Sequence, residues 1–188
     1  MTSLIAHALW KRLDTPGHDA AFLFGTDNGF ELRGTAVFHS AHGPARITYC
    51  VELDLGWSAR AGSVTGEMGP ALIAHDIRRD DAGWQLDGAP VEGLAHLHDL
   101  DFGFTPATNM TALRRVGLAV GQQAELPAVW FDVETPRPHL TELPQHYERR
   151  SEMAYFYRSL SASYEAVLEM APSGFTRLYP ALWEMIPQ

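Results

Sequence analysis

Residues 46–55 read Arg-Ile-Thr-Tyr-Cys-Val-Glu-Leu-Asp-Leu, and the order of these side chains decides the fold class. Apolar side chains occupy every second position, at Ile47, Tyr49, Val51, Leu53 and Leu55. A repeat of two places these side chains on one face of a β-strand and the polar ones on the other. Strands that bury one face and expose the other are typical of antiparallel sheets. The stretch therefore predicts an antiparallel β-protein.

The same alternation returns at residues 30–38 and 164–170. Residues that favour turns connect the expected strands at 26–29, 42–44, 80–83 and 172–174. The 16 Gly and 12 Pro leave little room for long helices, so short helices are expected at most at 4–13 or after Pro180. We predict one domain over residues 1–188, mostly β, with an antiparallel curved sheet or a partly open β-barrel and few short helices.

Two segments share a local pattern that is consistent with an internal duplication. Residues 49–57 and 164–175 each contain an alternating strand, then a glycine, then an aromatic residue. The proline-containing stretch 134–146 lies between them and would separate two halves of one sheet. A barrel of about eight strands is wide enough to enclose one small ligand, which links this fold to a binding function.

Charge, apolar runs and cysteine content exclude several classes of protein. The formal net charge of −9 argues against a general nucleic-acid-binding protein, because such proteins need a basic face. Residues 1–7 lack the features of a signal peptide, and no apolar run approaches the ~20 residues of a transmembrane helix. We therefore expect a soluble, cytoplasmic protein, and its oligomeric state stays open. Cys50 is the single cysteine, so an intrachain disulfide is excluded, and we expect it to be buried in the core.

A polar block covers residues 99–109 and continues into Leu113-Arg114-Arg115. Asp99 and Asp101, two residues apart, would point to the same side of a strand, and the arginines follow within reach. One interpretation is an Asp–Arg network that stabilises a turn. The other is a polar patch that binds a sugar or phosphate head group. A third hypothesis, catalysis by the two carboxylates or by a histidine, would make the protein a hydrolase or isomerase acting on a small lipid or sugar.

Metal and cofactor sites are not expected. His96 and His98 precede the two aspartates and resemble a ligand set, but on a strand they would face away from Asp99 and Asp101. The chain contains neither a Gly-x-Gly-x-x-Gly motif nor a Walker loop, so nucleotide cofactors have no anchor.

The polar block resembles the core motif of the putative glycolipid-binding family, a bacterial family formerly known as a domain of unknown function. The family pattern runs Asp-x-Asp, then Thr-Pro-x-Thr-Asn, then Arg-Arg. It is matched here by Asp99, Asp101, Thr105, Pro106, Thr108, Asn109, Arg114 and Arg115. Further similarity lies in Asp54 and Trp57 after a strand, in Gln145-x-Tyr147, and in the closing Tyr179-Pro180. The chain departs from the pattern at 110–113, where the family usually has Thr-Leu-Pro-Ile.

The resemblance implies a partly open barrel, compared with lipoprotein carriers that hold acyl chains, and it implies glycolipid binding. The leading hypothesis is a non-catalytic protein that holds a lipid-like or glycolipid-like amphipathic ligand in a barrel cavity, without a cofactor. The alternatives are the enzyme described above and a protein-interaction module with a filled core. The expected ligand-binding residues are Asp99, Asp101, Asn109, Arg114, Arg115, Trp57, Tyr147 and Tyr179.

Overall fold

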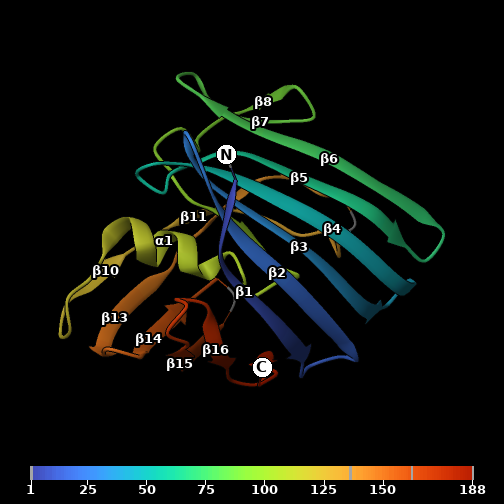
Figure 1. The fold of residues 1–188 in the computed structure, drawn as a ribbon. Helices are drawn as coiled ribbons and strands as arrows, with labels where there is room; N and C mark the ends of the chain where they lie inside the picture. Colours follow the sequence, from blue (N-terminus) through green and yellow to red (C-terminus); the bar gives the residue numbers. More distant parts are fainter. Residues whose placement is uncertain (1, 136, 162, 188) are drawn as a thin grey trace.

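The computed structural model describes residues 2–135, 137–161 and 163–187, and it is dominated by one large antiparallel sheet (Figure 1). Its 14 strands lie in the order β10 (Gln123–Glu125), β13 (His146–Ser151), β14 (Ala154–Ser159), β15 (Tyr164–Met170), β16 (Thr176–Tyr179), β17 (Trp183–Met185), β1 (Ser3–Arg12), β2 (Gly17–Thr26), β3 (Gly29–Ser40), β4 (Gly43–Asp54), β5 (Ala59–Met68), β6 (Ala71–Asp80), β7 (Gly83–Leu86) and β8 (Ala89–Val91). A second sheet has the order β12 (Thr141–Leu143), β11 (Ala128–Phe131) and β9 (Leu100–Phe102). One helix, α1 (Asn109–Val116), completes the secondary structure of the described residues.

The large sheet is curved and open. It ends at β10 on one side and at β8 on the other, and no ladder joins these two strands within the described part of the chain. Its two halves, blue to green and orange to red in Figure 1, meet where β17 pairs with β1, with Trp10 opposite Met185 and Arg12 opposite Trp183. The prediction of a mostly β fold with a curved sheet or partly open barrel is therefore confirmed.

The alternating stretches form strands β3, β4 and β15, as predicted. The four predicted turns connect β2 to β3, β3 to β4, β6 to β7 and β15 to β16. Two details were wrong. Leu55 lies past the end of β4 and is 71% exposed, because the strand stops at Asp54. Cys50 is half-buried on the outer face of the sheet rather than in the core.

The helices expected at 4–13 and after Pro180 were also wrong. Both segments form strands, β1 and β17, that pair with each other. In β1 the inward side chains are the small Ala6 and Ala8, followed by Trp10, whereas Leu4, Ile5 and Leu9 are exposed. Because large apolar residues also lie on the exposed face, the sequence of β1 does not show the alternation of apolar and polar residues that is typical of a strand. The described helix α1 instead begins at Asn109, within the block that was interpreted as a turn, and ends at Val116, where Gly117 caps it with a φ of 61°.

The smaller sheet packs inside the curve of the larger one, against β4, β5 and β6. The ring of Phe102 on β9 meets the ring of Tyr49 on β4 edge to face, with their centres 5.9 Å apart. Gly62 on β5 permits this approach, since a Cβ atom there would lie 2.5 Å from the Leu100 side chain. The N-terminal half of the curved sheet therefore encloses a packed core rather than an open space.

Candidate functional site

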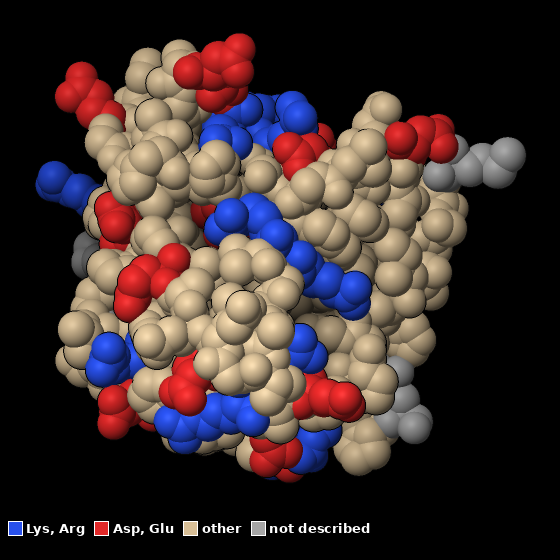
Figure 2. Space-filling view, turned by 90° about the vertical axis from the view of Figure 1, so that its left-hand side faces the viewer, with Lys and Arg blue, Asp and Glu red and all other residues tan. Residues whose placement is uncertain are grey.

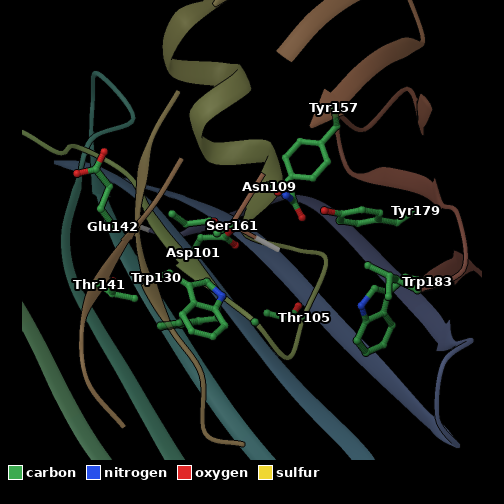
Figure 3. Close-up of a pocket in the computed structure, with 14 residues that line it drawn as sticks. Asp101, Thr105, Asn109, Trp130, Thr141, Glu142, Tyr157, Ser161, Tyr179 and Trp183 are labelled. Atoms are coloured by element: carbon green, nitrogen blue, oxygen red, sulfur yellow. The ribbon is translucent and has the colours of Figure 1, made fainter. Parts of the chain in front are cut away.

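A cavity of about 370 Å³ lies where the smaller sheet faces the C-terminal strands (Figure 3). A volume of several hundred cubic ångströms is usual for sites that bind small molecules. One wall comes from β9, β11 and β12, and the other from β14, β16 and β17. The lining residues are Asp101, Phe102, Gly103, Thr105, Asn109, Trp130, Thr141, Glu142, Leu143, Tyr157, Ser161, Tyr179, Leu182 and Trp183.

Asp101 provides a buried carboxyl group at the inner end of the cavity. It is 9% exposed, and its two oxygens accept hydrogen bonds from the Thr108 hydroxyl, at 2.5 Å, and the Gln145 side-chain amide, at 2.8 Å. Burial disfavours the charged form and raises the pKa of Asp101 to about 6. The carboxyl group is thus fixed in place and mostly ionised at neutral pH.

Asn109, the first residue of α1, lies beside Asp101. Its side-chain Nδ2 donates a hydrogen bond to the buried Tyr147 hydroxyl at 3.1 Å. This bond fixes the orientation of the amide group and leaves its Oδ1 atom toward the cavity (Figure 3). Tyr147 therefore acts on the cavity through Asn109 rather than by lining it.

Thr105 connects the cavity to a second buried carboxyl group. Its hydroxyl donates to Asp19 Oδ2, which also accepts a hydrogen bond from the Tyr49 hydroxyl at 2.9 Å. Asp19 is fully buried, and burial raises its pKa to about 7. Its Oδ1 atom has no hydrogen-bond partner among the residues that the structure describes. The sequence reading missed Asp19, although it occupies the inward side of β2 together with Ala21 and Leu23.

Trp130 and Trp183 stand on facing sides of the cavity (Figure 3). The indole N–H groups of the core tryptophans Trp10 and Trp84 donate to the backbone carbonyls of Thr176 and Leu97. Within the described part of the chain, the indole N–H groups of Trp130 and Trp183 have no such partner, and both tryptophans line the cavity. They are therefore free to donate to a ligand.

The sequence reading did not identify these two tryptophans, nor Tyr157. Each lies in a short segment whose neighbours are also apolar or aromatic, so the residue types alone indicate core. Only the pairing of distant strands brings Trp130 on β11 opposite Trp183 on β17.

Five of the eight predicted ligand-binding residues lie outside the cavity lining, namely Asp99, Arg114, Arg115, Trp57 and Tyr147. Asp99 is 2% exposed at its side chain and forms an ion pair with Arg115 at 2.6 Å. Arg114 donates to the Ser173 carbonyl at 2.7 Å, and its guanidinium lies 5.3 Å from the ring of Trp57. The Asp99–Arg115 pair thus agrees with the interpretation in which aspartates and arginines of this block stabilise the local structure. Asp101, Asn109 and Tyr179 line the cavity.

The histidines near the polar block have separate partners. His96 Nε2 lies 3.6 Å from Glu142, and His98 Nδ1 lies 3.0 Å from Arg79. Across residues 2–135, 137–161 and 163–187, no group of three His, Cys, Asp or Glu side chains is arranged to hold a metal ion. In Figure 2 a short strip of basic side chains crosses one face of the molecule, with acidic side chains on both sides of it.

The family model described as putative glycolipid-binding matches residues 7–185. The chain belongs to this putative glycolipid-binding family. Among solved structures, it is similar to a crystal structure of a DUF1089 family protein from Pseudomonas aeruginosa, with a TM-score of 0.76 and 26% sequence identity. The match covers 89% of this chain and 92% of that one. The comparison with curated proteins gives no match.

In this member of the glycolipid-binding family, the Thr-Pro-x-Thr-Asn motif builds the inner end of the cavity. Thr105 and Asn109 line it, whereas Thr108 holds the carboxyl group of Asp101. The polar side chains of the motif, Thr105, Thr108 and Asn109, each have a hydrogen-bond partner, so these groups are fixed before any ligand arrives. Among the described residues, no helix has the length and hydrophobicity needed to cross a membrane.

Proposed function

We propose that this protein binds an amphipathic molecule, similar to a lipid or glycolipid, in the cavity between the smaller sheet and β14, β16 and β17, and that it does not transform it. The observation that carries the proposal is the combination of aromatic and aliphatic walls with a buried polar end at Asp101, Thr105 and Asn109. Apolar pockets with a few convergent polar groups are typical of small-molecule sites. The description of the family supports the same class of ligand.

A second candidate is a hydrolase or isomerase acting on a small lipid or sugar, and the raised pKa of Asp101 favours it. Three observations weigh against this candidate. Asp99 is held by Arg115, no histidine is among the described lining residues, and the other lining carboxylate is Glu142, whose side chain is 41% exposed. Binding without catalysis is therefore the better-supported function.

A protein-interaction module with a filled core is the remaining candidate. The smaller sheet does fill the N-terminal half of the curved sheet, but the cavity of about 370 Å³ persists beside it. Our proposal treats residues 1–188 as one domain, with support from the pairing of β17 with β1. It also keeps the cytoplasmic location that the sequence led us to expect.

Exchange of ligand into the purified protein tests the proposal. The protein is incubated with a total bacterial lipid extract and repurified, and bound molecules are extracted and identified by mass spectrometry. Ser161→Trp places a large side chain at an exposed lining position, and Leu72→Trp is the matched control at a position 84% exposed on β6. We expect an unchanged lipid or glycolipid on the wild type and on Leu72→Trp but not on Ser161→Trp. Recovery of a converted product would favour the enzyme.

A further inference from the structure

We infer that the cavity takes an uncharged polyhydroxyl head group at its buried end, so that the apolar tail of the ligand points toward the mouth. This inference rests on the proposed function and adds to it the orientation and the charge of the ligand. The expectation from the sequence was an apolar tail in the barrel interior, with Asp99, Asp101, Arg114 and Arg115 facing or supporting the head group. Of these four residues, Asp101 lines the cavity. In the structure both arginines lie outside the cavity lining.

The buried part of the cavity carries fixed hydrogen-bonding groups beside the rings of Phe102 and Trp183. Asp101, Thr105 and Asn109 are between 4% and 9% exposed, so the hydrogen-bonding groups at this end lie deep. Among the less buried lining residues, Leu143 and Leu182 are half-buried, and the polar Glu142 and Ser161 are exposed. Beside the exposed lining residue Ser161, Leu160 is 75% exposed. A ligand that entered tail first would bury these polar groups against carbon, and each unmatched group would cost free energy.

The hydrogen-bonding groups suit hydroxyls. Asn109 Oδ1 and the carboxyl group of Asp101 accept hydrogen bonds, whereas the indole N–H groups of Trp130 and Trp183 donate them. A hydroxyl group both donates and accepts, so a polyol can satisfy both kinds of partner. The flat rings of Trp130 and Trp183 can also contact the apolar faces of a sugar ring. A head group that only accepts hydrogen bonds would leave Asn109 Oδ1 unmatched and would offer no hydrogen to the Asp101 carboxylate.

The charge of the cavity disfavours an anion. The described lining residues include two carboxylates, Asp101 and Glu142, and no Lys, Arg or His. Two arginines that lie outside the lining have acidic partners. Arg115 pairs with Asp99, and Arg12, which lies 5.5 Å from the Trp183 ring, pairs with Asp14 and Glu134, although its Nη1 atom has no hydrogen-bond partner among the described residues. A phosphate or carboxylate head group would therefore meet a buried negative charge without a compensating cation.

The test compares ligands that share one tail and differ in the head group. Binding of octyl β-glucoside, octyl phosphate, octanoate and octyltrimethylammonium is measured by isothermal titration calorimetry at pH 7.5, below micelle formation. Methyl β-glucoside tests the head group without a tail. We expect octyl glucoside to bind about ten-fold or more tightly than octyl phosphate and octanoate, and methyl glucoside to compete with it. Ser161→Trp should abolish these differences by blocking the cavity.

The outcomes separate this inference from the proposed function. If octyl phosphate or octanoate binds as tightly as octyl glucoside, or if methyl glucoside fails to compete, the orientation is wrong and the binding function stands. Tighter binding of octyltrimethylammonium than of the glucoside would overturn the uncharged head group, because the carboxylates would then select a cation. If none of the octyl compounds binds the wild type, the proposed function itself fails.

Discussion

The Arg115 guanidinium forms a two-pronged ion pair with the Asp99 carboxylate, with Nε 3.0 Å from Oδ1 and Nη2 2.6 Å from Oδ2. The pair joins the last turn of α1 to the segment that leads into β9. Because α1 begins at Asn109 and β9 contains Asp101, the same pair fixes two elements that carry the polar end of the cavity. Its geometry makes it a positioning contact.

Removal of Arg115 should therefore destabilise the protein. Arg115→Met leaves the buried Asp99 carboxylate without its cation, which we expect to lower the free energy of unfolding by about 3–5 kcal/mol. Urea denaturation at pH 7.5 measures the loss. Arg150→Met is the control, because its ion pair with Glu148 is half-exposed and the change should lie within about 0.5 kcal/mol. Equal losses in the two variants would show that the Asp99–Arg115 pair stabilises the protein no more than an exposed ion pair does.

Asp19 should make stability fall as the pH rises. Its pKa is about 7 in the folded state against 3.8 for an ordinary aspartate, because burial disfavours the carboxylate. Between these two pKa values the folded state binds more protons than the unfolded state. The contribution of Asp19 to the free energy of unfolding is therefore complete below pH 3.8 and is lost as the pH rises to about 7. The contribution is up to about 4 kcal/mol. Urea denaturation at pH 4.5 and 8 should show a smaller loss for Asp19→Asn than for the wild type. An unchanged pH dependence would contradict the burial of an ionisable Asp19. Asp76→Asn is the control, because the Asp76 side chain is half-exposed.

Even the smallest side chain at position 62 should destabilise the protein. A Cβ atom at this position would lie 2.5 Å from Leu100 Cδ2 and 3.3 Å from Phe102 Cζ, so Gly62→Ala pushes β9 away from β5. We expect a loss of about 1–3 kcal/mol in the free energy of unfolding. Adding Leu100→Ala removes the clash, and the double variant should lose less than the sum of the two single variants. Strict additivity in denaturation experiments would show that the two sheets do not meet there.

Trp130 should contribute to binding through its indole N–H. Trp130→Phe keeps an aromatic ring and removes the donor, and we expect octyl glucoside to bind about 5–10-fold more weakly. Trp57→Phe is the matched control, because Trp57 stacks on Phe30 at 3.9 Å, outside the cavity lining. Calorimetric titration of the three proteins provides the comparison. A stronger effect at Trp57 than at Trp130 would place the ligand elsewhere.

Much of the fold was predictable because the alternation of apolar and polar residues in β4 matches the alternation of buried and more exposed side chains. Ile47, Tyr49, Val51 and Leu53 alternate with exposed or half-buried positions, and antiparallel neighbours follow from short turns. The segment β1 was not predictable in this way. Its inward positions Ala6 and Ala8 are small, and its large apolar residues are exposed, so tertiary pairing with β2 and β17 overrides the local pattern.

The candidate site was predictable only where a local motif supplies it. Asp101 and Asn109 lie in one continuous block, and both line the cavity. Trp130, Tyr157 and Trp183 are distant in sequence and are brought together by the order of strands in the two sheets. The ligand-binding roles of Arg114 and Arg115 stay predictions. They were made without foreseeing α1, which directs the two side chains toward Ser173 and Asp99.

Native mass spectrometry of the freshly purified protein tests the central claim most directly, namely that the cavity holds an amphipathic ligand. Wild type, Ser161→Trp and Leu72→Trp are produced in bacteria, and their masses are recorded side by side before and after organic extraction. We expect a one-to-one complex with an uncharged glycolipid or a similar molecule in the wild type and in Leu72→Trp, and the bare chain in Ser161→Trp. Bare chains in all three proteins, also after exposure to bacterial lipids, would contradict the claim.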